Sequence, residues 1–104
     1  MKYNNVKYME FISRTFRLHR INLKQPLLLV QGKLGYLGSG HLDMGICEEN
    51  GDAIAIVKPV KTFNEILFTE VVDVTSEGER LGINIGMKGE DALKRICMPW
   101  ELKD

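Results

Sequence analysis

A serine, a histidine and an aspartate lie close together in the run Ser39-Gly40-His41-Leu42-Asp43. The run follows a glycine-punctuated apolar segment and precedes a short helical segment, so we expect it where a strand ends and a helix begins. Ligands of open α/β sheets favour the carboxyl ends of strands, and the first turn of a helix offers unpaired N–H groups to an anion. Ser39, Gly40, His41 and Asp43 therefore predict a binding site for a small anion.

A second polar stretch, Lys58-Pro-Val-Lys61-Thr62, follows the next predicted strand. If the two strands are parallel, their carboxyl ends share one edge of the sheet, and Lys61 and Thr62 would face the first run across a shallow cleft. A purely structural interpretation stays open beside this one. In it Asp43 and Thr62 only cap helices, Lys61 only meets solvent and the glycines only make turns.

Other chemistries find less support in these residues. His41, Asp43 and Cys47 lack any established metal-ligand spacing, so no metal or other cofactor is predicted. Ser39 beside His41 has no nucleophile elbow and no orienting third member, so the catalytic residues stay unknown. An enzyme that acts on a small anionic metabolite is the alternative to a binding domain. Cys47 and Cys97 are expected to be buried free thiols.

The apolar pattern predicts the elements that would position this site. Strands are expected at residues 27–31, 34–39, 53–57 and 71–74, with a tight turn at Gly32-Lys33. Helices are expected at residues 43–50, after Thr62, after Ser76 and at residues 90–97; both Thr62 and Ser76 begin a capping box. Strand–helix–strand–helix–strand order implies two right-handed parallel crossovers. The fold class is α+β, a mixed sheet with a βαβαβ core, packed helices and an N-terminal antiparallel ribbon.

Residues 6–12 and 15–23 are aromatic and β-branched, which favours the two strands of that ribbon, and Pro26 is expected to separate it from the core. The ribbon is apolar on both sides, and an isolated ribbon is marginal in water. We therefore expect other copies of the chain to cover it. The residues predicted to mediate this self-association are Tyr8, Phe11, Phe16, Leu18 and Ile21.

Charge divides the chain in the same way. Residues 1–24 carry six basic side chains against one acidic one, whereas residues 25–104 carry eight against thirteen. The basic ribbon could lie against the acidic body of a neighbouring copy. Alternatively, it could bind single-stranded nucleic acid by clamping and stacking. That alternative would use Tyr3, Tyr8, Phe11, Arg14, Phe16, Arg17 and Arg20.

The length of 104 residues and ordinary composition predict one globular domain, with the ribbon at residues 1–24 and the core at residues 26–97. No apolar run approaches the ~20 residues of a membrane span, and the sequence begins without a secretory pattern. We expect a cytoplasmic protein that does not contact membranes.

Three motifs carry a family resemblance: residues 35–43 (GYLGSGHLD), 60–67 (VKTFNEIL) and 81–93 (LGINIGMKGEDAL). In this order they resemble the YunC-like family, a small bacterial and archaeal domain of unknown function. The resemblance implies an α+β domain whose N-terminal β region forms tetramers, and it implies no established activity. The chain departs from the family at Ser39, where many relatives have Cys, and at Pro59, where they often have Gly. The first departure weakens any role for an essential thiol there.

Overall fold

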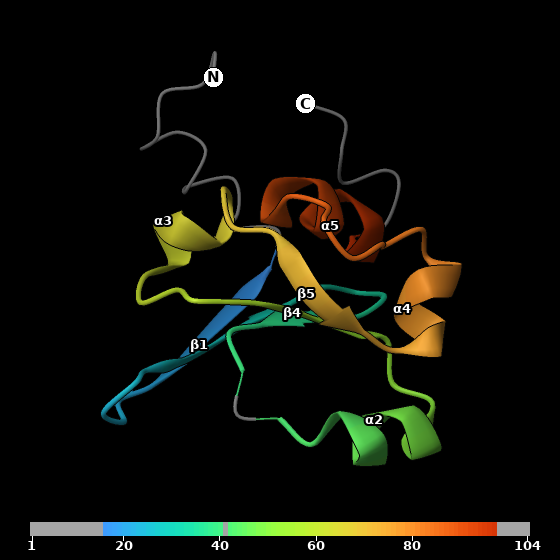
Figure 1. Ribbon diagram of the computed structural model, residues 1–104, viewed down its shortest axis with the longest axis horizontal. Helices are drawn as coiled ribbons and strands as arrows, with labels where there is room; N and C mark the ends of the chain where they lie inside the picture. The colour runs from blue at the N-terminus through green and yellow to red at the C-terminus, as the bar shows by residue number, and fades with distance from the viewer. Residues whose placement is uncertain (1–15, 41, 98–104) are drawn as a thin grey trace.

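The fold is seen in a computed structural model that describes residues 16–40 and 42–97. A five-stranded sheet runs through the middle of the molecule, with helices on both of its faces (Figure 1). The strands are β1 (Arg17–Ile21), β2 (Leu27–Gln31), β3 (Tyr36–Gly38), β4 (Ile54–Val57) and β5 (Val71–Val74). The helices are α2 (Met44–Asn50), α3 (Phe63–Ile66), α4 (Ser76–Arg80) and α5 (Gly89–Ile96). The predicted α+β fold with a mixed sheet is confirmed.

The strands lie in the order of the sequence, β1-β2-β3-β4-β5, and only β3 and β4 are parallel neighbours. The predicted second parallel crossover is wrong, because β5 runs antiparallel to β4, with Val71 opposite Val57. The reason is the short connection. The helix α3 has four residues, about 6 Å of rise, so the chain does not return along the sheet before β5 begins.

The segment predicted as the second strand of a separate ribbon belongs to the core sheet. Strand β1 pairs antiparallel with β2 along its whole length, from Arg17 opposite Gln31 to Ile21 opposite Leu27. Pro26 therefore stands in the turn between two paired strands, where its missing N–H costs no ladder bond. The expected partner strand at residues 6–12, with Tyr8 and Phe11, lies outside the described residues.

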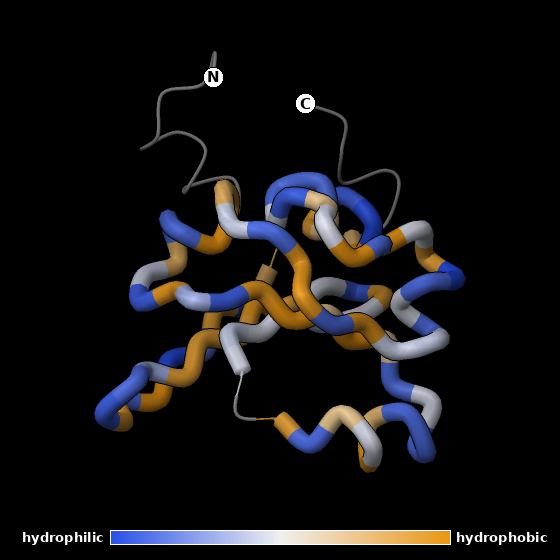
Figure 2. Tube along the Cα trace, in the orientation of Figure 1, coloured by the Kyte–Doolittle hydropathy of each residue, from blue (hydrophilic) through white to orange (hydrophobic). Residues whose placement is uncertain are grey.

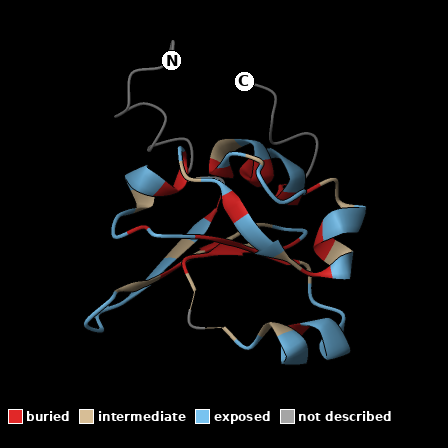
Figure 3. Ribbon diagram, in the orientation of Figure 1, coloured by how far each residue is buried: buried red, intermediate tan, exposed pale blue. Residues whose placement is uncertain are grey.

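The main core lies between the sheet and the helices α3 and α5, which cover the same face (Figure 1). Buried and hydrophobic residues follow the strands, as the colouring of the backbone shows (Figures 2 and 3). Phe16 is 5% exposed and belongs to this core, and Leu18 packs against it. Two residues predicted to serve contacts between copies are thus placed within their own subunit, whereas Ile21 is 51% exposed.

The other face of the sheet carries a smaller cluster under α2, built from Cys47, Ile54 and Ile56. Because α2 covers the β3–β4 half of that face, the β1–β2 half is left with half-buried Leu27 and Leu29. Cys47 and Cys97 are both buried, as predicted.

Helix ends follow the predicted capping chemistry with one exception. Asp43 caps α2, Gly51 ends it in the left-handed conformation (φ 77°), and Thr62 caps α3 with a complete capping box. The cap of α4 is Thr75 rather than the predicted Ser76. Within the described ranges, no helix combines the length and the apolar character that crossing a membrane requires.

Candidate functional site

The polar residues predicted to bind an anion follow β3 and β4. Because these strands are parallel, with Gly38 opposite Ile56, both chain segments leave the sheet at the same edge. Ser39, Gly40 and Asp43 follow β3, and Lys61 and Thr62 follow β4. Both polar stretches therefore follow strands that end at the same edge of the sheet, and the shallow cleft expected between them stays a prediction. His41 lies outside the described residues.

Ser39 has a structural role at this edge. Its side chain is buried, and its hydroxyl accepts a hydrogen bond from the Leu28 N–H at 2.9 Å and donates one to the Pro26 carbonyl at 3.3 Å. These bonds tie the end of β3 to the start of β2. The hydroxyl is thus committed to the backbone.

Asp43 and Thr62 are likewise engaged by the backbone. The Asp43 carboxylate accepts from the Ile46 N–H at 3.1 Å, and the Thr62 hydroxyl accepts from the Glu65 N–H at 3.2 Å. Glu65 returns the contact, because its carboxylate accepts from the N–H groups of Lys61 at 2.7 Å and Thr62 at 3.1 Å. The Lys61 N–H above all, then the Thr62 N–H, lowers the pKa of Glu65 despite some desolvation.

Three cationic residues lie on the segments at the carboxyl edge. The Lys61 side chain is exposed, and Arg20 reaches the same loop from β1, with its guanidinium Nη1 donating to the Lys61 carbonyl at 3.3 Å. Lys58 lies beside Gly40, since a Cβ built on Gly40 would stand 4.0 Å from Lys58 Cδ. Among the described residues, no carboxylate forms an ion pair with any of these three side chains.

Two of these three cations were missed from the sequence. The sequence predicts Arg20 in a separate ribbon, so it does not indicate that Arg20 reaches the loop after β4. Lys58 belongs to the predicted polar stretch at residues 58–62, but only the pairing of β3 with β4 brings it next to Gly40. Gly40 itself has φ 118°, a conformation that other residues rarely adopt.

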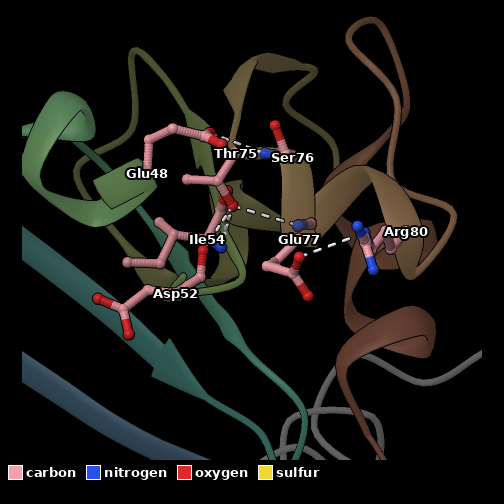
Figure 4. Close-up of polar contacts among 8 residues, drawn as sticks. Glu48, Asp52, Ile54, Thr75, Ser76, Glu77 and Arg80 are labelled. Atoms are coloured by element: carbon pink, nitrogen blue, oxygen red, sulfur yellow. Dashed lines mark hydrogen bonds and ion pairs between the residues drawn. The ribbon is translucent and has the colours of Figure 1, made fainter. Parts of the chain in front are cut away.

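A cleft of about 350 Å³ lies at the opposite edge of the sheet, at the amino ends of β3 and β4. Its lining comes from three segments: the β2–β3 turn with the start of β3, the α2–β4 connection, and α4. Figure 4 shows Asp52 of the connection on one side of Ile54 and the Glu77–Arg80 ion pair of α4 on the other. Sequence reasoning did not predict this cleft.

Metal and thiol chemistry have no geometric support in the part of the chain that is described. No group of three His, Cys, Asp or Glu side chains there is arranged to hold a metal ion. Burial, followed by the nearby charges of Asp52 and Asp43, raises the pKa of the Cys47 thiol. A raised pKa leaves the thiol protonated and unreactive at neutral pH.

The fold and the carboxyl edge define a small α+β domain without a recognisable catalytic constellation in its described residues. The chain belongs to the family described as a domain of unknown function (DUF1805), whose model matches residues 38–96. This range contains β4, β5 and the helices α2, α3, α4 and α5. No curated protein matches the sequence.

A solved structure shares the fold. It is the crystal structure of a protein of unknown function from Thermoplasma acidophilum, which is 26% identical in sequence and superposes with a TM-score of 0.68. The match covers 78% of this chain and 92% of that one. This likeness supports the fold. Neither the family description nor the structural neighbour names an activity.

Proposed function

We propose that this domain binds a small anionic ligand, a phosphate or carboxylate compound, at the carboxyl edge of β3 and β4. The observation that carries the proposal is the presence of three cationic residues at this edge: Lys58 lies beside Gly40, and Arg20 bonds the backbone of Lys61. These side chains come from β1 and from the β4–α3 loop, and among the described residues none is neutralised by an ion pair.

The arrangement favours an anion for electrostatic reasons. Like charges near a protein surface repel one another by about 1 kcal/mol at 4 Å in water and more where solvent is displaced. Where two of these cations lie near one another, a bound anion offsets their repulsion, and it gains charge-assisted hydrogen bonds from each cation that it reaches. Glu65, an acidic residue that contacts this loop, is held by two N–H groups of its own capping box, and the charge of Lys61 also acts on it.

The edge is also held in position before any ligand arrives. Arg20 bonds the Lys61 carbonyl, and the Gln25 amide donates to the Val60 carbonyl at 3.0 Å. The β1–β2 turn and the β4–α3 loop are therefore fastened together. A site that is already ordered loses less conformational entropy on binding.

The test is an NMR titration of the full chain at low ionic strength with phosphate, pyrophosphate and citrate. Saturable shifts of the Gly40 and Lys61 amides are expected, with affinity that falls at least about 10-fold in Lys58→Gln and in Lys61→Gln. The matched control is Lys94→Gln on α5, whose lysine faces Asp91 at 3.7 Å, away from this edge. Shifts that do not saturate, or equal losses in the control, would contradict the proposal.

Self-association is a second candidate, favoured by the uncovered β1–β2 half of the sheet. Ile21 and Leu23 are each 51% exposed, and Leu27 and Leu29 are only half-buried. Exposed apolar surface of this kind often marks an interface. The resemblance to the YunC-like family, which implies tetramers, points the same way. Light scattering of the full chain and of Ile21→Ser tests it, because a monomeric parent would exclude an assembly at this face.

A further inference from the structure

The cleft at the amino edge of the sheet has a rigid floor. The β2–β3 turn is closed by a hydrogen bond from the Gly32 N–H to the Gly35 carbonyl at 2.9 Å, and Leu34 donates to the Ile96 carbonyl of α5 at 2.8 Å. Tyr36 donates to the Ala53 carbonyl at 2.9 Å, which joins the turn to the start of β4. The backbones pack so closely here that a Cβ on Gly32 or Gly35 would overlap Ile96 O or Ala53 O.

The walls of the cleft are fixed as well. The buried Thr75 hydroxyl donates to the Asp52 carbonyl at 2.7 Å, which holds the α2–β4 connection against the start of α4. The Glu48 carboxylate of α2 accepts from the Ser76 N–H at 2.9 Å and joins the two helices directly (Figure 4). The space between the walls is therefore formed without a ligand, which lowers the conformational cost of filling it.

The charged side chains of the lining are balanced in sign. Lys33 and Arg80 are positive, and Asp52 and Glu77 are negative. Glu77 and Arg80 form an exposed ion pair at 3.2 Å, whereas Lys33 and Asp52 have no ion-pair partner among the described residues. Lys33 and Asp52 come from different segments, the β2–β3 turn and the α2–β4 connection. The cleft thus offers one unused charge of each sign.

We propose that this cleft binds a small zwitterion of the free amino-acid class. The Asp52 carboxylate receives the ligand's ammonium group, and Lys33 receives the carboxylate, while Arg80 of the same lining is paired with Glu77. A ligand of one sign would leave half of these groups unmatched and would be repelled by the like-charged pair. The volume, about 350 Å³, is at the small end of ligand pockets, which suits a metabolite rather than a peptide.

The experiment is an NMR titration of the full chain with the twenty protein amino acids, one at a time. Saturable shifts are expected at the Gly35, Ala53 and Leu81 amides for at least one of them. The best binder is then compared with its decarboxylated amine and its deaminated acid. Each analogue lacks one of the two charges, so each should bind at least about 10-fold more weakly. Failure of all twenty amino acids, or an analogue that binds as well as its parent, overturns the proposal.

Two variants test the assigned roles. Asp52→Asn should weaken binding of the amino acid and leave binding of the deaminated acid unchanged. Lys33→Gln should weaken binding of the amino acid and leave binding of the amine unchanged. The matched control is Glu49→Gln, which removes an exposed carboxylate of α2 outside the lining. The amide spectrum of each variant reports whether it is folded. Equal binding by Asp52→Asn and the parent overturns the role given to Asp52. Neither result bears on the carboxyl edge, which is probed by different amides and anions.

Discussion

The hydroxyl of Thr75 accepts a hydrogen bond from the backbone N–H of Ile54 at 3.1 Å, so the residue that caps α4 also holds the first residue of β4. The same oxygen accepts from the Gly78 N–H at 3.2 Å, and its proton goes to the Asp52 carbonyl at 2.7 Å. One buried hydroxyl therefore joins a helix, a strand and the wall of the amino-edge cleft.

Thr75→Val should lower the free energy of unfolding by about 2–4 kcal/mol, because a side chain of similar size leaves the two buried N–H groups of Ile54 and Gly78 without an acceptor. Urea unfolding followed by circular dichroism measures the loss. Thr75→Ser keeps the hydroxyl and is the matched control, expected to lose clearly less. A loss in Thr75→Ser as large as that in Thr75→Val would contradict the role given to the hydroxyl, because the methyl group would then contribute just as much.

Gly89→Ala should destabilise the domain by at least about 2–3 kcal/mol, since its new Cβ would overlap the Ile66 carbonyl of α3 and neither backbone can yield cheaply. Gly86→Ala is the comparison. It meets no atom within 4 Å, but its φ of 96° costs about 1–2 kcal/mol for a residue with a Cβ. In thermal unfolding, the melting temperature of Gly89→Ala should be lower than that of Gly86→Ala. The reverse order would contradict the close approach of α5 to α3.

The positions of the strands could be predicted, because their own residues specify them. Which strands pair, and in which direction, could not be predicted. The runs at residues 27–31 and 71–74 match β2 and β5, since short apolar segments bounded by turn residues have few alternatives. The direction of β5 depends instead on how far α3 carries the chain. Likewise, β1 alternates too weakly to reveal that one face enters the core, where Phe16 packs.

The contacts of the site that join residues close in sequence could be predicted, and those that join distant residues could not. Asp43 and Thr62 cap helices within three residues of themselves, and sequence spacing shows this directly. Arg20 lies 41 residues from Lys61 in sequence, and only the sheet order brings them together. The amino-edge cleft draws on three distant segments, so no single motif could have indicated it.

Glu48→Gln should make the free energy of unfolding fall less steeply as the pH decreases through the acid range. The hydrogen bond with Ser76 lowers the pKa of Glu48 from its ordinary 4.5, so the folded state binds this proton less readily than the unfolded chain. Its contribution is then complete above pH 4.5 and is lost as the pH falls through the lower folded-state pKa. Urea unfolding of the parent and the variant, from neutral to acidic pH, should show their difference shrinking below pH 4.5.

Glu49→Gln is the control for that measurement, because the neighbouring carboxylate makes no ion pair or side-chain hydrogen bond with the described residues. Its stability should follow the parent's at every pH. A difference between Glu48→Gln and the parent that persists unchanged into acid would show that the contact does not depend on the charge of Glu48.

Phe16→Ala decides whether β1 serves its own subunit or another copy. Phe16 is 5% exposed within one chain, where it belongs to the main core, so its truncation should cost about 3–5 kcal/mol. Because those contacts are intramolecular, the loss measured in urea should be the same at low and high protein concentration. Ile21→Ser, at the exposed end of β1, should cost far less stability, and light scattering of this variant reports on self-association. If the loss in Phe16→Ala instead grows with dilution, the ring stabilises a contact between copies, and its place in the core of one subunit is wrong.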